Sequence, residues 1–409
     1  MKNSWENPHR WGMLGLATAV QTGATLVTYG VGPLSAVWQQ EFGWTRLQAG
    51  LLMSAVQLGP LLSMIWVGRM LDRDGERGWV GGGAVLLGLS VLTTMWGTGF
   101  SAFLLCLALT GLLYGTAQPG GSRAVARWFG DRERGLAMGI RQTGIPLGGA
   151  LAGLALPFFS RVYGWEAGVG FQASVSILCG LAFLIFYREP SVCNPPKQSI
   201  PPLGESFRAV LGAPSLVPVL VSGIALVSLQ MVLVTHWVSY VSERAGCSLE
   251  EGGRLLSLLL VSGAAGRVLL PWVSDRTDKG RQPFLLLCLA ACGAGVWVIP
   301  FLSWQGGWIF LSLWIGFFGL GWYSLFLVQV AEAVEDQTVG FAVGFALTVN
   351  QIGIILAPVL FGWLADTSSY GVAWGAVGAG LTGAGFFQGR ECFRSFSSSG
   401  GRKKEGRLL

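Results

Sequence analysis

Long apolar runs alternate with short charged or Gly/Pro-rich stretches along almost the whole chain. Each run holds about 20 residues, which is the length that an α-helix needs to cross the hydrocarbon core of a bilayer. The pattern therefore predicts an all-α membrane protein with twelve transmembrane helices in two six-helix bundles. The first set is expected near residues 11–37, 47–68, 79–98, 100–126, 134–158 and 165–187, and the second near 214–241, 252–274, 283–302, 306–331, 338–363 and 370–389.

Two polar segments lie outside these runs. Residues 188–213 contain five prolines, which favour an extended linker over a helix. Residues 390–409 are basic and rich in serine and glycine, a composition typical of disorder. We therefore expect an N-terminal bundle over 1–187, a cytoplasmic linker over 188–213, a C-terminal bundle over 214–389 and a disordered cytoplasmic tail over 390–409.

Composition and charge agree with a membrane protein. The chain is 52% hydrophobic and only 12% charged, whereas soluble domains carry about 25% charged residues. The net charge of +6 therefore reports topology, and no nucleic-acid partner is expected. With the N-terminus in the cytoplasm, 21 Lys and Arg residues fall inside and four outside. This asymmetry predicts a multi-pass protein of the cytoplasmic (inner) membrane with both termini inside; the four outer arginines are Arg46, Arg161, Arg244 and Arg254.

The chain has no P-loop and no HExxH, GxSxG or zinc-ligand spacing. Cys288 and Cys292 are one helical turn apart, but no histidine or carboxylate accompanies them, so we interpret them as small apolar filler. The sequence therefore predicts neither an enzyme nor an ATP-driven pump, and it predicts no cofactor and no metal site.

Two arginines, Arg267 and Arg141, lie inside apolar runs. A charge there costs at least ~2.5–3.5 kcal/mol, so it usually faces a cavity and has a function. No Asp or Glu lies at comparable depth, and Arg267 is about 12 Å from Asp275 at the helix end. A guanidinium binds carboxylate or phosphate through two parallel hydrogen bonds. The pair therefore predicts a path for an anion; the alternative is that each arginine caps carbonyls near the inner end.

The loops after the second and eighth predicted helices resemble each other. Residues 68–77 contain Asp72, Arg73 and Arg77, and residues 274–281 contain Asp275 and Arg276. A carboxylate followed by a glycine turn and arginines can lock such a loop against neighbouring helices, which gives these residues a gating role. The alternative is a solvated, positively charged loop. Recurrence in both halves favours an internal repeat.

Two six-helix halves, a central linker and this repeated loop resemble the major facilitator superfamily over about residues 10–390. Residues 144–149 are similar to the antiporter motif of helix 5, with a different spacing around Pro146. The stretch from Gly266 and Arg267 to Ser274 and Asp275 resembles helix 8 of the oxalate/formate antiporter and monocarboxylate transporter branch. In that branch the arginine binds the substrate carboxylate, and the resemblance implies this role for Arg267. The lysine of helix 11 in the oxalate-type antiporter has no counterpart in residues 341–363.

Other polar side chains in the predicted helices share faces that could line a cavity. Residues 114, 118 and 122 repeat at a spacing of four, and residues 21, 25 and 28 share a face of the first helix. The alternative is hydrogen bonding between helices. His236, near the outer end of its helix, is a candidate proton relay or a hydrogen-bonded interface residue. The complete set of expected substrate-binding residues is Arg267, Arg141, Tyr114, Gln118, Gln21, Tyr29, Asn350, Gln351 and Tyr323.

We therefore expect a monomeric secondary or facilitative transporter of a small, monocarboxylate-like organic anion, working by alternating access. A proton is a candidate co-substrate. Two alternatives remain open. The antiporter-like stretch favours a multidrug/proton antiporter, and a third reading is a transporter-like membrane sensor that binds without carrying.

Overall fold

The computed structural model describes residues 9–189, 208, 212–213, 216–277, 281–334 and 339–405. Most of the expected linker over 188–213 lies outside the described residues. The first set of helices is α1 (Arg10–Phe42), α2 (Arg46–Asp74), α3 (Glu76–Leu92), α4 (Phe100–Tyr114), α5 (Ala117–Trp128), α6 (Asp131–Tyr163) and α7 (Trp165–Phe186). The second is α9 (Leu216–Ala245), α10 (Leu249–Ser274), α11 (Gln282–Val298), α12 (Gln305–Glu332), α13 (Val339–Thr367) and α14 (Tyr370–Glu405).

These helices confirm the all-α architecture. The short 3-10 helices Thr93–Trp96 and Ile299–Phe301 extend α3 and α11, and α4 and α5 form one span that is interrupted at Gly115 and Thr116. Counted in this way, the described helices give the two sets of six that the sequence predicts. Nine of these spans are, within the described residues, apolar and long enough to cross a membrane.

Both halves begin their second span with the same capping box. The Thr45 hydroxyl accepts from the backbone N–H of Gln48, whose side chain accepts from the Thr45 N–H, and Ser248 and Glu251 form the same pair of bonds at the start of α10. A capping box satisfies N–H groups of the first turn that have no partner in the helix. Its occurrence at corresponding positions agrees with an internal repeat.

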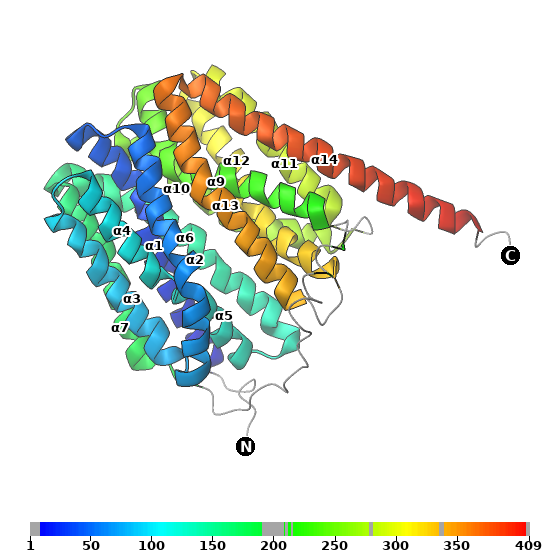
Figure 1. Ribbon diagram of the computed structural model, residues 1–409, viewed down its shortest axis with the longest axis horizontal. Helices are drawn as coiled ribbons and strands as arrows, with labels where there is room; N and C mark the ends of the chain where they lie inside the picture. Colours follow the sequence, from blue (N-terminus) through cyan, green and yellow to red (C-terminus); the bar gives the residue numbers. More distant parts are fainter. Residues whose placement is uncertain are drawn as a thin grey trace.

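The chain's last helix is longer than expected. The sequence predicts a disordered tail from Arg390, whereas α14 continues to Glu405 and projects away from the bundle in Figure 1. The described helix therefore extends past the predicted end of the last span, while disorder of the tail stays a prediction. No proline interrupts this segment, and elongating an existing helix avoids the cost of nucleation. Serine and glycine each oppose this elongation by at most about 1 kcal/mol.

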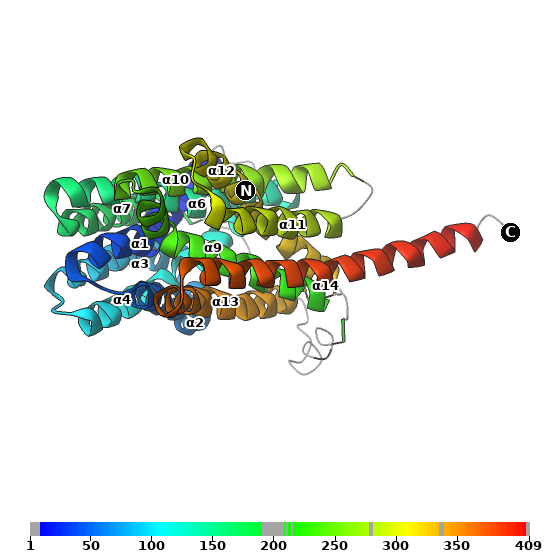
Figure 2. The ribbon, with the colours of Figure 1, turned by 90° about the horizontal axis from the view of Figure 1, so that it is seen from above.

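The two bundles meet along a defined set of helices. α2 packs against α13, α6 against α10 and α1 against α9, and Figure 2 shows these helices as neighbours. The connections at residues 73–77 and 127–134 and the end of α10 at residues 275–277 lie at what we call the basic end. The α1–α2, α9–α10 and α13–α14 connections lie at the opposite end. In Figure 1, α2 and α13 lie together near the opposite end and diverge toward the basic end.

Glycines allow the closest approach between the halves, and they lie nearer the opposite end. A Cβ on Gly32 of α1 would lie 1.9 Å from the Val234 carbonyl oxygen of α9. A Cβ on Gly253 of α10 would lie 2.1 Å from the Gly153 carbonyl oxygen of α6. No side chain fits at these distances, so the backbones of the two halves are in direct contact there.

Candidate functional site

Arg267 lies in α10, two turns from the basic end, and is only 6% exposed. Its Nε donates to the Leu320 carbonyl at 3.2 Å, and its Nη1 donates to the Gln142 carbonyl of the other half at 3.4 Å. The guanidinium carbon lies 5.1 Å from the centroid of the Tyr323 ring, a cation–π distance. None of these partners carries a negative charge, so the guanidinium has no counterion among the described residues.

Arg141, on α6, is fully buried. Its Nη1 donates to Gln21 at 3.0 Å and its Nη2 donates to Gln118 at 3.1 Å. Within the described part of the chain its Nε has no hydrogen-bond partner. Both acceptors are neutral amide oxygens from its own half, so this second buried cation also lacks a described carboxylate partner.

Three tyrosines connect the surroundings of the two arginines. Tyr114 and Tyr323 lie near both guanidiniums, and Tyr29 lies near that of α10. Gln21 Nε2 donates to the Tyr114 hydroxyl at 3.3 Å, and Gln230 Nε2 donates to the Tyr29 hydroxyl at 2.9 Å across the interface. Side chains from both halves therefore form one polar region at the depth of the two arginines.

The two predicted residues of α13 lie in different surroundings. Asn350 is 2% exposed, and neither atom of its side-chain amide has a hydrogen-bond partner among the described residues. Gln351 Nε2 donates to the Gln57 carbonyl at 2.7 Å and so joins α13 to α2. A buried amide without partners costs free energy, which makes Asn350 the stronger candidate for a ligand contact.

The loop after α2 forms contacts within its own half. The side chain of Asp72 lies outside the described residues. Arg73 pairs with Asp74 at 2.8 Å, and this hydrogen bond lowers the pKa of the Asp74 carboxyl. Arg77 Nε donates to the Leu184 carbonyl at 2.6 Å and so caps the end of α7.

The corresponding loop after α10 also binds within its own half. Asp275 pairs with Arg281 at 2.8 Å, and Arg281 also pairs with Glu332. The Arg276 guanidinium carbon lies 3.6 Å from the Trp272 ring centroid. These contacts fix each loop to its own bundle, and a gating role for the two loops stays a prediction.

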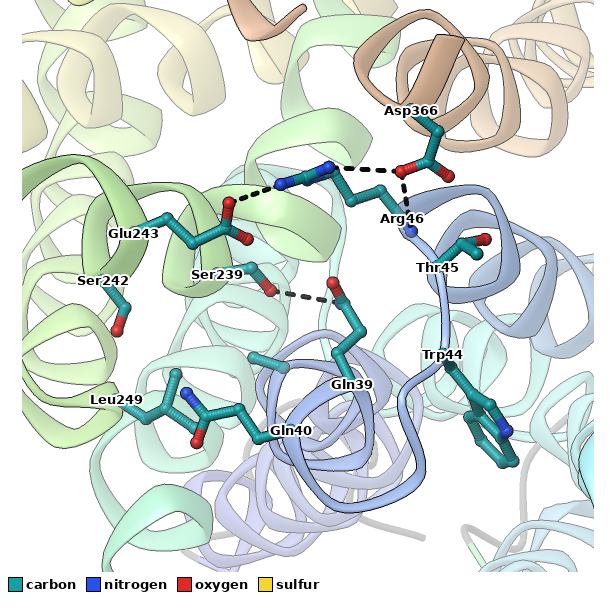
Figure 3. A pocket seen from close by; sticks show the side chains of 11 residues that line it. Gln39, Gln40, Trp44, Thr45, Arg46, Ser239, Ser242, Glu243, Leu249 and Asp366 are labelled. Carbon is teal, nitrogen blue, oxygen red and sulfur yellow. Dashed lines mark hydrogen bonds and ion pairs between the residues drawn. The ribbon is translucent and has the colours of Figure 1, made fainter.

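Cross-half ion pairs occur at the opposite end. Arg46, at the start of α2, reaches Glu243 at 2.5 Å and Asp366 at 3.3 Å (Figure 3). Asp366 also accepts from the backbone N–H groups of Arg46 and Leu47 at 3.2 and 2.7 Å. A carboxylate at a helix N-terminus is favourable, because the helix dipole is positive there. In the sequence Arg46 is only one of four outer arginines, and no local pattern predicts this closure.

A pocket of about 350 Å³ lies beside these ion pairs. In Figure 3, Gln39 and Ser239 point toward each other, and Gln39 Nε2 donates to the Ser239 hydroxyl at 3.2 Å. Its walls come from both halves, so it is part of the closure at the opposite end. The lining residues are Ala36, Gln39, Gln40, Trp44, Thr45, Arg46, Ser239, Ser242, Glu243, Leu249 and Asp366.

His236 lies on α9 below this closure and is fully buried. Its Nε2 lies 2.9 Å from the Pro358 carbonyl, to which it donates, and within the described residues its Nδ1 has no partner. Its ring lies 5.0 Å from that of Phe361. These contacts join α9 to α13 within the C-terminal half, and a role as proton relay stays a prediction.

The ion pairs at the opposite end give a testable ranking. Asp366→Ala should open this end more than Glu243→Ala, because Asp366 also accepts from the first N–H groups of α2. Loss of such a cap costs about 1 kcal/mol, which is a roughly fivefold shift in the population of the closed state. In a chain without native cysteines, Ser257→Cys would report the opening, because Ser257 is buried at the α6–α10 contact. Its labelling by a membrane-impermeant maleimide should rise more in Asp366→Ala. Equal labelling in both variants would contradict the capping contribution.

A buried carboxylate was also missed. Glu76 is fully buried at the start of α3 and pairs with Arg123 at 2.8 Å and Arg127 at 2.9 Å on α5. In the sequence Glu76 lies beside a charged loop, and this position predicts an exposed side chain. The pairs hold α3 and α5 together within the N-terminal half.

Comparison with known proteins gives concordant results. The family described as Major Facilitator Superfamily matches residues 17–358. An uncharacterized MFS-type transporter of Mycobacterium tuberculosis is 28% identical over 377 residues, which cover 90% of this chain and 82% of that protein. The 3-(3-hydroxy-phenyl)propionate transporter of Escherichia coli is 25% identical over 323 residues, which cover 79% of each protein.

A solved structure has the same fold. It is a bacterial homologue of the human lysosomal transporter Spinster in an inward-facing and occupied conformation. The TM-score is 0.79 at 16% sequence identity, with 96% of this chain and 98% of that chain covered. At this identity the likeness concerns the fold alone.

Proposed function

Because the chain belongs to the major facilitator superfamily, we propose that it carries a small organic anion, most simply a monocarboxylate, across the cytoplasmic membrane by alternating access. The chain is a transporter and not an enzyme. Relatives of the chain include transporters of organic acids. The monocarboxylate specificity, the monomeric state and a proton as co-substrate belong to the proposal.

The main support for this proposal is the environment of Arg267. A guanidinium stays charged at every physiological pH. Among the described residues, two backbone carbonyls and an aromatic ring hold this one. Burying a charge without a counterion costs several kcal/mol. A bound carboxylate would supply that counterion through a bidentate pair. Arg141 and the tyrosines would then lie around the substrate, and their convergence on it is part of this proposal.

The asymmetry of charge orients the molecule. If the 21 basic residues lie inside, the basic end faces the cytoplasm and both termini are cytoplasmic. The ion pairs between Arg46, Glu243 and Asp366 then close the outer side. This orientation supports an inward-facing state, in which the substrate would enter or leave the site from the cytoplasm.

Binding to purified protein distinguishes the proposal from a drug exporter. A ligand that binds only the folded state stabilises it by mass action and so raises the melting temperature. At a ligand concentration of about 100 times Kd, the free energy of unfolding rises by about 2.7 kcal/mol. We expect 3-(3-hydroxyphenyl)propionate or lactate to raise the melting temperature, and ethidium to have no effect. Stabilisation by ethidium alone would favour the multidrug alternative. A sensor would bind a carboxylate but fail to move it into proteoliposomes.

A further inference from the structure

Pro146 interrupts the hydrogen bonding of α6 at the depth of the arginines. Proline has no backbone N–H, so the carbonyl four residues earlier loses its helical donor. In α6, which runs unbroken from Asp131 to Tyr163, that carbonyl belongs to Gln142. It is the carbonyl that accepts from Arg267 Nη1 at 3.4 Å.

This hydrogen bond is a link between the two halves. Gln142 belongs to the N-terminal bundle and Arg267 to the C-terminal bundle, and α6 and α10 pack against each other along the interface. The other carbonyl bound to Arg267, that of Leu320, lies in its own half. The freed carbonyl therefore joins the guanidinium to α6. When the two halves rock, α10 must move past this helix.

The carbonyl also occupies part of the edge that a carboxylate needs. A bidentate pair uses two adjacent N–H groups of the guanidinium. On the edge formed by Nη1 and Nη2, Nη1 is engaged by Gln142 and Nη2 forms no hydrogen bond within the described part of the chain. A hydrogen bond to a charged oxygen is roughly twice as strong as one to a neutral carbonyl. An arriving carboxylate can therefore displace the Gln142 carbonyl.

We propose that the Gln142 carbonyl, freed by Pro146, is a place-holder for the substrate carboxylate on Arg267. Binding of the anion breaks this link between α6 and α10, and it thereby couples occupancy of the site to movement of the halves. Pro146 is then a positioning residue that acts through its effect on one carbonyl. The inference rests on the proposed function, because it takes Arg267 as the carboxylate ligand.

A second proline in the same helix supplies a matched control. Pro157 frees the carbonyl of Gly153 by the same rule. That carbonyl faces the backbone of Gly253, since a Cβ on Gly253 would lie 2.1 Å from it, and it contacts no arginine side chain among the described residues. Pro157→Ala therefore restores a helical N–H in α6 without affecting Arg267.

The first test needs no ligand. In Pro146→Ala the new N–H satisfies the Gln142 carbonyl within the helix, so Arg267→Gln no longer leaves that carbonyl unpaired. We compare the melting temperature of Arg267→Gln with that of its parent in each background. This difference should be more favourable to Arg267→Gln in Pro146→Ala than in the wild type, and it should be the same in Pro157→Ala as in the wild type. Contacting residues show such non-additive effects, whereas separate ones do not. Additive effects of Pro146→Ala and Arg267→Gln would overturn the link.

The second test uses 3-(3-hydroxyphenyl)propionate as the probe. Its Kd should fall about fivefold in Pro146→Ala, the factor that corresponds to one net hydrogen bond that no longer has to be broken. Pro157→Ala should leave the Kd unchanged, and Arg267→Lys should lose the gain from Pro146→Ala. An unchanged Kd in Pro146→Ala, with normal binding in the wild type, would overturn the place-holder. No binding to the wild type at all would instead reject the monocarboxylate of the proposed function, while the melting experiment would still report the link.

Discussion

Replacing Arg267 with glutamine is expected to weaken binding of the anion about tenfold to a hundredfold. A hydrogen bond to a charged group is worth roughly 1.5–3 kcal/mol, and glutamine keeps the length of the side chain but removes the charge. Lysine keeps the charge without the planar fork, so Arg267→Lys should retain part of the affinity. Titration of the purified variants with a carboxylate should rank them Arg, Lys, Gln.

Arg281→Gln is the control for this ranking. Arg281 pairs with Asp275 and Glu332 at the basic end, so its loss should change stability without changing affinity. An arginine with a purely structural role would give the same result at position 267. A folded Arg267→Gln variant with the affinity of the wild type would contradict the anion site.

Closure of the opposite end should fail in Gly32→Ala. The added Cβ would lie 1.9 Å from the Val234 carbonyl oxygen, so α1 and α9 must separate. Overpacking of this kind costs about 1–3 kcal/mol, which corresponds to a shift of about 5- to 150-fold in the population of the closed state. Labelling of Ser257→Cys from the outside should rise, and transport should slow because the inward-facing state is rarely reached.

A control glycine lies on the same helix. An added Cβ at Gly15 would have open space around it, so Gly15→Ala should leave both labelling and transport unchanged. If Gly32→Ala folds and shows the same labelling as Gly15→Ala, this contact does not hold the outer side closed.

The architecture could be predicted because each span must satisfy its own backbone in lipid. Apolar runs of about 20 residues then fix the number and order of helices. The ends of the helices could be predicted less accurately. α1 and α14 extend through polar sequence to Phe42 and Glu405. Backbone hydrogen bonds extend these helices beyond their apolar runs, and hydropathy alone does not predict that extension.

The site was predictable where it rests on residue type. A charge in an apolar run identified Arg267 and Arg141, and spacing of four on adjacent helices identified Gln21, Gln118 and Tyr114, which the structure brings into one hydrogen-bonded network. Whether this network holds substrate stays a prediction.

What the sequence did not indicate is which groups meet across the two halves. Arg46 pairs with residues about 200 and 320 positions away, and no local pattern relates them. The carbonyl of Gln142 has no residue-type signature either. Its only signal in the sequence is Pro146 four positions later, which belongs to the antiporter-like stretch and also removes a helical hydrogen bond.

Uptake of a labelled carboxylate by proteoliposomes tests the central claim most directly. Wild-type protein should accumulate or exchange 3-(3-hydroxyphenyl)propionate or lactate faster than empty liposomes, and Arg267→Gln, reconstituted in equal amount, should reduce this rate at least about tenfold at subsaturating concentration. A wild type that binds a carboxylate without moving it, or an Arg267→Gln variant that transports as fast as the wild type, would contradict the account.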